Sequence, residues 1–399
     1  MSSSKPSLRF SNFSDELNSA TLAEITSKKI SYGIVQAGPH VEGGMPYIKS
    51  KDLNGPLLIE ELERTSEEIA KKYRRSEVNP GDIVFSLRGN IGVSQIVPDS
   101  IPVANLTQGT ARISCSSKIN PVYLINELQT SRVRKRVLAL AKGSTFQEIS
   151  LEELRNVIVN FPSYEEQEQV ASFLSTVDKK VRLLKEKHAL LEQYKKGVMQ
   201  KLFKQEIRFK DDGGSEFPDW QWKQGNEVFD AISNKSHNSD LPILAITQEH
   251  GAIPRDLINY QVQVTDGSVA SYKVVEEGDY IISLRSFQGG IEYSRYKGIC
   301  SPAYIILRPS ISIDDDFYRY YLKTGRFIQE MKRRLEGIRD GKILSYKYFS
   351  EIKLPFPCIE EQRKISHFIN ILDKKLSLVK EQVELTQTFK KGLLQQMFV

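Results

Sequence analysis

The sequence has few of the features that mark membrane, secreted or zinc-binding proteins. No uncharged run approaches the roughly 18 residues that a transmembrane helix needs, and the first ten residues lack the apolar stretch of a secretory signal. The three cysteines, Cys115, Cys300 and Cys358, lie far apart and form no CxxC motif. A disulfide framework and a cysteine zinc site are therefore unsupported. We expect a soluble, cytoplasmic protein with reduced thiols.

Catalytic motifs are missing as well. The sequence contains no Gly-x4-Gly-Lys-Ser/Thr phosphate loop, which argues against an ATPase. It also contains no Asn/Asp-Pro-Pro-Tyr/Phe strip and no glycine-rich S-adenosylmethionine loop, so the chain is not expected to methylate by itself. The five histidines do not stand at ligand spacings, so no metal site is expected. A nuclease built from scattered Asp, Glu and Lys residues remains a minor alternative.

The charge balance is mildly basic. The 399 residues include 56 Lys and Arg against 50 Asp and Glu, for a formal net charge of +6. This excess is compatible with nucleic-acid binding and excludes a histone-like basic tail. A chain of this length is too long for one hydrophobic core, so at least two domains are expected.

The chain is a tandem duplication. Residues 161–203 align without gaps to residues 356–398 at an offset of 195, and 18 of the 43 positions are identical. Upstream, the similarity is looser: GDIVFSLRGN at 81–90 corresponds to GDYIISLRSF at 278–287. Each half therefore combines a divergent region of about 150 residues with a similar segment of about 45.

The two similar segments have the heptad pattern of a coiled coil. Apolar residues recur at spacings of four and three, which are the a and d positions of a helix–helix seam. Lys195 and Lys390 occupy a positions in the same register. The predicted seam and partner interface comprises Val170, Leu174, Val177, Val181, Leu184, Leu191, Ile365, Ile369, Leu372, Leu376, Val379 and Leu393.

Each predicted helix begins just after a Phe-Pro pair, and a Glu-Glu pair in its first turn complements the helix dipole. A helix of about 40 residues is roughly 60 Å long, and its apolar stripe needs a partner. One alternative is a homodimeric coiled coil. The other is an antiparallel pair within one chain, which would place the two globular regions at opposite ends, related by a pseudo-twofold axis.

The divergent regions predict α+β domains. Short β-type runs occur at Ile83–Leu87, Tyr280–Leu284 and Tyr304–Leu307, and helical stretches occur near 121–141 and 314–335. The predicted fold class is α+β, with two globular domains separated by two long helices that form an antiparallel coiled coil and a pseudo-twofold internal repeat. The predicted boundaries are 1–160 for the first domain, 161–204 for the first helix, 205–355 for the second domain and 356–399 for the second helix.

Basic and polar residues in matching places of the two halves are candidate DNA contacts, since cations along a groove gain by releasing counterions. Arginine can also read guanine, although a structural or phosphate contact is the favoured role for Arg88 and Arg285. For the basic helices the competing interpretation is a solvated surface. The candidates are Arg88, Asn90, Arg132, Arg134, Lys142 and Ser144 in the first half and Arg285, Gln288, Arg333, Arg339 and Lys342 in the second.

The repeated motifs resemble a known family. Each divergent domain is followed by a Phe-Pro-x-x-Glu-Glu-Gln helix start and a Lys-Lys-Gly helix end, and Leu8-Arg9-Phe10 is echoed by Ile207-Arg208-Phe209. This organisation is similar to that of the DNA-specificity (S) subunit of type I restriction-modification systems, over nearly the whole chain. The first domain lacks the tryptophan often found after that opening, whereas the second has Trp220 and Trp222.

The resemblance implies a division of labour. Each target-recognition domain would read one half of a bipartite double-stranded DNA site, and the helices would separate the halves and bind methyltransferase (M) subunits, two per chain. Adenine methylation would be performed by those partners, and ATP-driven translocation and cleavage by restriction (R) subunits. No cofactor is expected in this chain; S-adenosylmethionine, ATP and Mg would belong to the partner subunits. The alternative is a coiled-coil scaffold whose globular ends bind proteins.

Overall fold

The computed structural model of the chain describes residues 5–143, 147–238, 240–258, 269–282, 291–335 and 346–399. The chain divides into two compact units. Unit 1 comprises Met1–Lys187 and Val379–Val399, and unit 2 comprises His188–Leu378. Each unit therefore contains one divergent region together with parts of both repeated segments.

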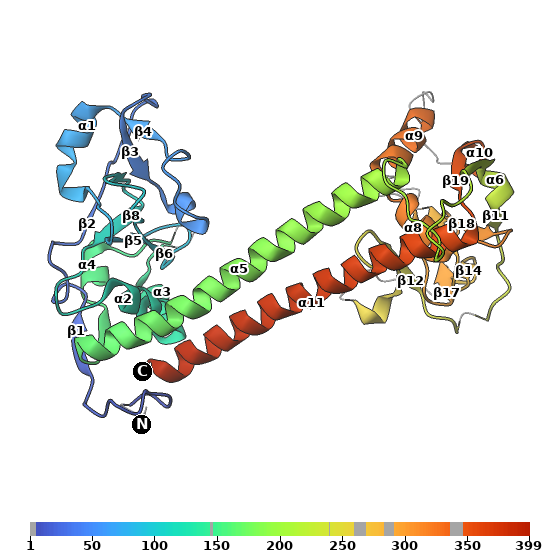
Figure 1. The fold of residues 1–399 in the computed structure, drawn as a ribbon. Helices are drawn as coiled ribbons and strands as arrows, with labels where there is room; N and C mark the ends of the chain where they lie inside the picture. Colours follow the sequence, from blue (N-terminus) through green and yellow to red (C-terminus); the bar gives the residue numbers. More distant parts are fainter. Residues whose placement is uncertain (1–4, 144–146, 239, 259–268, 283–290, 336–345) are drawn as a thin grey trace. The chain divides into compact units, whose positions relative to one another are not determined.

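Two long helices dominate the chain, α5 (Tyr164–Phe203) and α11 (Ile359–Met397), and both units contain a part of each (Figure 1). In unit 1, the last turn of α11 at Met397 joins the same buried cluster as Leu174 near the start of α5. In unit 2, Phe203 at the end of α5 shares a cluster with Ile369 near the start of α11. The two helices are therefore antiparallel within each unit, and the pairing is intrachain rather than homodimeric.

Burial along the helices follows the predicted heptads. The a and d residues are buried or half-buried, whereas most residues between them are exposed, as expected for an apolar stripe that packs on one side. Each helix starts after a proline, Pro162 or Pro357, because proline disfavours helical geometry in the residue before it. The seam residues that are buried are Val170, Leu174, Val177, Ile365, Ile369, Leu372, Val379 and Leu393; Val181, Leu184, Leu191 and Leu376 are half-buried.

Unit 1 is built on a four-stranded antiparallel sheet and a two-stranded pair. The sheet has the order β2 (Ser31–Tyr32), β8 (Thr110–Ile113), β5 (Ile83–Ser86), β6 (Ser94–Ile96). β1 (Asn18–Thr21) pairs with β9 (Ile158–Phe161), so the domain begins and ends side by side. A separate three-stranded sheet, which has its own apolar cluster, has the order β4 (Arg64–Thr65), β3 (Met45–Ile48), β7 (Asn105–Leu106).

Unit 2 repeats the first two features and changes the third. Its main sheet has the order β11 (Phe229–Ile232), β18 (Ile305–Pro309), β15 (Tyr280–Ile282), β16 (Glu292–Tyr293), and β10 (Gln221–Gln224) pairs with β19 (Lys353–Phe356). In place of the three-stranded sheet it has two pairs, β12 (Leu244–Thr247) with β13 (Gly251–Pro254) and β14 (Lys273–Val275) with β17 (Gly298–Cys300). The two units thus share a frame, which consists of the four-stranded sheet and the strand pair that joins the two ends of the domain. They differ in the additional strands.

The two predicted helical stretches are each broken into two helices. Thr130 separates α2 (Pro121–Gln129) from α3 (Ser131–Leu140), because its backbone is extended and its side chain caps α3 by accepting a hydrogen bond from the Val133 amide. In unit 2, Thr324 accepts in the same way from the Phe327 amide, between α8 (Asp315–Tyr321) and α9 (Gly325–Leu335).

The turns before the central strands also match. Asp82 accepts a hydrogen bond from the Asn79 amide, as Asp279 does from that of Glu276, and the glycine before each aspartate has a positive φ. The short helices in the described part of the chain are η1 (Ser50–Asn54), α1 (Glu67–Lys72), η2 (Arg74–Ser76), α4 (Leu151–Arg155), α6 (Gly225–Val228), η3 (Arg255–Leu257) and α10 (Tyr346–Ser350). Within the described residues, no helix is long and apolar enough to cross a membrane. The domain boundaries drawn from the sequence stay predictions.

Candidate nucleic-acid interface

The repeated Glu-Glu-Gln motif fixes each domain to its helix through a buried ion pair. Glu166 accepts from Nε and Nη2 of Arg9 at 2.8 and 2.7 Å, and Glu361 accepts from the same atoms of Arg208 at 3.1 and 2.8 Å. Both glutamates are buried, and their hydrogen bonds raise the pKa of the two arginines. Such bidentate pairs fix geometry as well as charge. From the sequence, the role predicted for these glutamates was interaction with the helix dipole. Their arginine partners were not predicted.

The glutamine of the motif binds the start of an earlier helix of the same half. Gln167 Oε1 accepts from the Asn120 amide at 2.8 Å, and Gln362 Oε1 accepts from the Asp314 amide at 2.9 Å. Asn120 and Asp314 are the N-cap residues of α2 and α8. The motif therefore positions the divergent domain on α5 in unit 1 and on α11 in unit 2 in the same manner.

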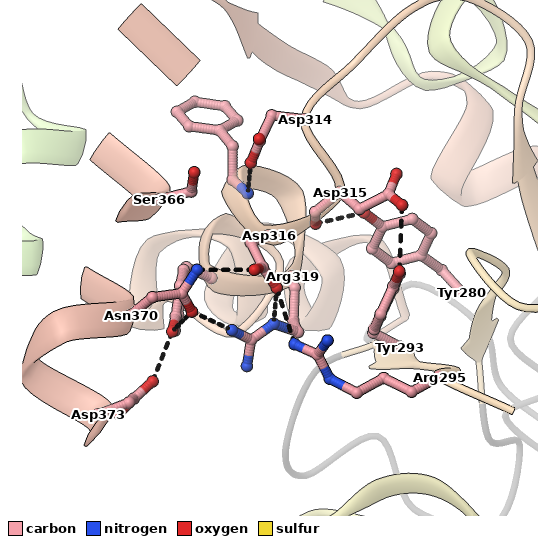
Figure 2. A network of polar contacts seen from close by, with 12 residues as sticks. Tyr280, Tyr293, Arg295, Asp314, Asp315, Asp316, Arg319, Ser366, Asn370 and Asp373 are labelled. Atoms are coloured by element: carbon pink, nitrogen blue, oxygen red, sulfur yellow. Dashed lines mark hydrogen bonds and ion pairs between the residues drawn. The ribbon is translucent and has the colours of Figure 1, made fainter. Parts of the chain in front are cut away.

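In unit 2 a polar network adds to this anchor (Figure 2). Asn370 of α11 donates to Asp316 of α8 at 2.7 Å and accepts from Arg319 at 2.9 Å, while Asp373 accepts from the Tyr320 hydroxyl. Burial raises the pKa of Asp316, but the Asn370 hydrogen bond and Arg319 outweigh it and bring that pKa below its ordinary value. The network therefore links α8 to α11 through several side-chain hydrogen bonds.

The structure brings together two of the predicted DNA contacts, Arg88 and Lys142, around Glu148. The Arg88 Nη2 donates to Glu148 Oε1 at 2.9 Å, and the backbones of Lys142 and Glu148 exchange two hydrogen bonds at 2.9 and 3.0 Å. The Lys142 ammonium forms an ion pair with Glu153 at 2.7 Å. About two-fifths of the Arg88 side chain is exposed, at 41%. Both cations lie at the surface; Ser144, another predicted contact, is outside the described residues.

The other first-half candidates have different environments. Asn90 donates to the Asn54 side chain at 2.7 Å, and Arg134 is exposed on α3. Arg132 forms an ion pair with the fully buried Glu127, and only 33% of the Arg132 side chain is exposed, so it is not simply part of a solvated helix face. Burial raises the pKa of Glu127 to about 7, although Arg132 opposes the shift.

In unit 2, Arg333 is exposed on α9 and lies 3.7 Å from the Glu330 carboxylate. Its three-quarters exposed side chain is available to a ligand, at 75%. The remaining candidates, Arg285, Gln288, Arg339 and Lys342, lie outside the described residues. None of the candidate DNA contacts is tested by these positions, and all stay predictions. Among the described residues no group of three or more His, Cys, Asp or Glu is arranged to hold a metal ion.

Both halves of the chain match a known family. A model of the type I restriction modification DNA specificity domain matches twice, at residues 15–193 and 219–387. This chain belongs to that family. Family membership confirms the resemblance drawn from the repeated motifs and identifies the chain as a specificity subunit, the DNA-recognition component rather than an enzyme. Its two matches correspond to the two halves of the duplication.

Individual specificity subunits are similar to the chain over long stretches. The MjaVIII specificity subunit of Methanocaldococcus jannaschii is 24% identical over 390 residues, which is 90% of this chain and 86% of that subunit. The EcoBI specificity subunit of Escherichia coli is 32% identical over 165 residues, covering 39% of this chain and 35% of that subunit. The crystal structure of an S subunit from M. genitalium has a TM-score of 0.59 at 18% identity and 99% coverage of both chains. The last likeness shows the fold.

Proposed function

We propose that this specificity subunit recognises a bipartite DNA site, with one half read by each recognition domain. The observation that carries the proposal is the repeated anchor, Arg9 with Glu166 and Arg208 with Glu361, which holds two domains on equivalent helix starts. The anchoring contacts are the same in both domains, whereas the strands added to the shared sheets differ. Two domains that recognise different half-sites would need this combination. Candidate base contacts must then come from the parts that differ, because a shared frame cannot distinguish two sequences.

The proposal is tested by exchanging one domain. Residues 5–160 would be replaced by the corresponding segment of another specificity subunit, and methylated adenines would be mapped in a host that carries the complete system. We expect one half-site to change and the other to stay. The matched exchange of residues 205–355 should have the opposite effect. A hybrid that changes both half-sites together would refute independent reading, and a hybrid that changes neither would refute readout by these domains.

The helices also offer docking surfaces for the methyltransferase subunits. The large apolar side chains that are exposed on both helices outside the a and d positions include Leu190 and Tyr194 on α5, and Leu385 and Phe389 on α11. Each pair lies 195 positions from the other, so the duplication repeats it. Leu190 and Leu385 are 65% and 61% exposed, and each stands four residues before an exposed aromatic residue; exposed apolar patches mark interaction sites. Unit 1 contains Leu385 and Phe389 and unit 2 contains Leu190 and Tyr194, which supports two M subunits per chain.

In this assembly the chemistry belongs to the partners. M subunits would bind S-adenosylmethionine and methylate adenine, and R subunits would use ATP and Mg to translocate and cleave DNA. The specificity subunit would act with them in the cytoplasm, where the DNA is. Leu190→Asp with Leu385→Asp should abolish binding of M subunits without unfolding the chain, because both side chains are already exposed. Lys187→Asp with Gln382→Asp, also exposed, is the matched control and should assemble normally.

A coiled-coil scaffold is the competing function. It shares the helix pair but predicts no preference among DNA sequences. Selection of bound duplexes from a random pool by the assembled complex separates the two: enrichment of a split motif supports DNA recognition, and retention of the pool composition supports the scaffold.

A further inference from the structure

Unit 1 contains a basic concavity that is separate from the Arg88 and Lys142 cluster. Its volume is about 400 Å³. The charged residues that line it are Lys28, Lys29, Arg74, Arg75, Arg112 and Glu77. These residues come from the segment before β2, from η2 and the turn after it, and from β8, so the chain brings five cations and one carboxylate together from distant parts of the sequence.

Arg112 is the unusual member of this group because it is buried. Only 7% of the residue is exposed, and it lies on β8 opposite Val84 of the central strand β5. Its Nη1 donates to the Glu77 carbonyl oxygen at 2.7 Å, but its Nε–H is buried and has no hydrogen-bond partner. Burial lowers the pKa of Arg112, while the nearby Asp82 and Glu77 carboxylates oppose that shift. An unpaired buried donor of this kind costs free energy unless a ligand accepts from it.

The duplication shows that the sheet does not need this arginine. In unit 1, Ile83 pairs with Ile113 and Val84 pairs with Arg112. In unit 2 the corresponding pairs are Tyr280 with Leu307 and Ile281 with Ile306. The position of Arg112 is thus occupied by a buried isoleucine, Ile306, in the other copy. The arginine is a feature of the first domain alone.

Exposed cations surround this buried donor at the rim of the concavity. Lys28 and Lys29 are exposed, as are Arg74 and Arg75. The backbone of η2 is held by the Ser31 hydroxyl, which donates to the Arg75 carbonyl at 3.2 Å. Arg74 Nε is 4.0 Å from the Glu77 carboxylate, the one carboxylate among the described lining residues. No aromatic residue is among the described lining residues, so the lining offers no surface on which a base could stack.

We propose that this concavity is a phosphate site that binds the sugar-phosphate backbone of the DNA read by unit 1, with Arg112 at its floor and the lysines at its rim. The proposal rests on the proposed DNA recognition and adds a site that fixes the duplex without reading bases. A guanidinium presents several donors in a plane and can give two of them to phosphate oxygens. Exposed lysines add charge that releases counterions from the duplex.

The experiment measures DNA affinity of the full chain at several salt concentrations. Two duplexes are used, one with the mapped recognition site and one of random sequence. Lys28→Ala with Lys29→Ala should weaken both by the same factor and lower the slope of log K against log salt by up to about 2. Arg112→Ile, which copies the other domain, should weaken both roughly tenfold and lower the slope by about 1. Lys179→Ala with Lys180→Ala on α5 removes the same charge elsewhere. This control should leave the affinity of the chain for both duplexes unchanged.

The outcomes separate this site from the proposed function. If the lysine variant retains the parent salt slope and affinity, the phosphate site is wrong while DNA recognition stands. If the variant changes preference between the two duplexes, the concavity reads bases and the proposal is also wrong. If the parent chain itself does not distinguish the duplexes, the proposed function fails first. The lysine variant keeps the test valid should Arg112→Ile fold poorly, since both lysines are exposed.

Discussion

The Lys195 ammonium on α5 forms an ion pair with the Asp373 carboxylate on α11. The residues 195 positions away make the same contact with the roles of the helices exchanged, since Lys390 of α11 lies 2.6 Å from Asp178 of α5. Both lysines occupy a positions of the predicted seam, where a charge would otherwise face apolar neighbours. The duplicated pairs therefore fix the register of the antiparallel helices in each unit by the same device.

We expect a favourable coupling free energy of about 1 kcal/mol between Lys195 and Asp373. A double-mutant cycle with Lys195→Met and Asp373→Asn, followed by urea unfolding, measures it. The cycle on Lys390 and Asp178 is the internal control and should give the same sign with a smaller value, because Asp178 is more exposed than Asp373, at 49% against 37%. Zero coupling in both cycles would show that the pairs do not stabilise the helix register.

Removal of Arg208 should be far more harmful. Glu361 is fully buried and also accepts from Trp220 Nε1 at 2.8 Å, so Arg208→Met leaves an uncompensated carboxylate. We expect a loss of about 3–5 kcal/mol in the free energy of unfolding and a red-shifted tryptophan emission. Arg208→Met combined with Glu361→Gln removes the buried charge and should recover part of the loss. A double variant that is less stable than the single one would contradict this account.

Glu127 should make unit 1 less stable as pH rises. Its pKa is about 7 in the folded chain against 4.5 for the ordinary group. Because the folded chain binds this proton more tightly, stability falls between these two pH values and is constant above the higher one. Relative to the parent, Glu127→Gln should gain about 3 kcal/mol between pH 4.5 and pH 7, measured by chemical unfolding and circular dichroism. A difference that does not vary with pH would contradict the raised pKa.

Arg88 and Glu148 form a matched pair of variants for the DNA surface. If Arg88 contacts a phosphate, Arg88→Met should weaken binding to all duplexes alike and lower the salt slope by about 1. Glu148→Gln removes the carboxylate that holds Arg88 and should strengthen binding, because less negative charge faces the duplex. Binding isotherms at several salt concentrations measure both. A change of preferred base with an unchanged slope would instead identify Arg88 as a base-reading residue.

The helices should set the distance between the two half-sites. Inserting one heptad into each helix, after Leu184 and after Val379, preserves the a and d register and adds about 10 Å. Along B-DNA this length equals about 3 base pairs, which also rotate the second half-site by roughly 100°. We expect a longer unspecified spacer, the same bases at each end and weaker binding. Selection of duplexes from a random pool measures the spacer length and the affinity. An unchanged spacer with undiminished affinity would mean that the helices do not set the distance between the half-sites.

The helix pair could be predicted because its signal is local and repeated. Val177, Leu184 and Leu191 recur every seven residues, and the second copy preserves the register. Pairing within one chain was one of two alternatives, since an apolar stripe does not identify its partner. The break at Thr130 was missed because threonine occurs inside helices as well as at their ends, and only its extended backbone decides the matter.

The candidate site was harder to predict because its contacts join residues that are remote in sequence. Arg9 and Glu166 are separated by 157 positions, and neither has a local pattern that reveals the other. Arg132 belonged to a run without acids, yet its partner Glu127 stands just before that run and is buried. One sequence signal could have identified Arg112: it corresponds to an isoleucine, Ile306, in the other copy.

The pairing of β1 with β9 also has a genetic consequence. The recognition domain of unit 1 is a loop of chain whose first and last strands are hydrogen-bonded, with Asn18 opposite Phe161, and Gln221 lies opposite Phe356 in unit 2. Recombination between genes at the first and last strands of a domain would exchange the whole recognition domain in a single event. A crossover inside the similar helix segments would also preserve the lysine and aspartate of each register pair. On the proposed function, such exchanges would create new DNA specificities without a sequence of point mutations through inactive intermediates.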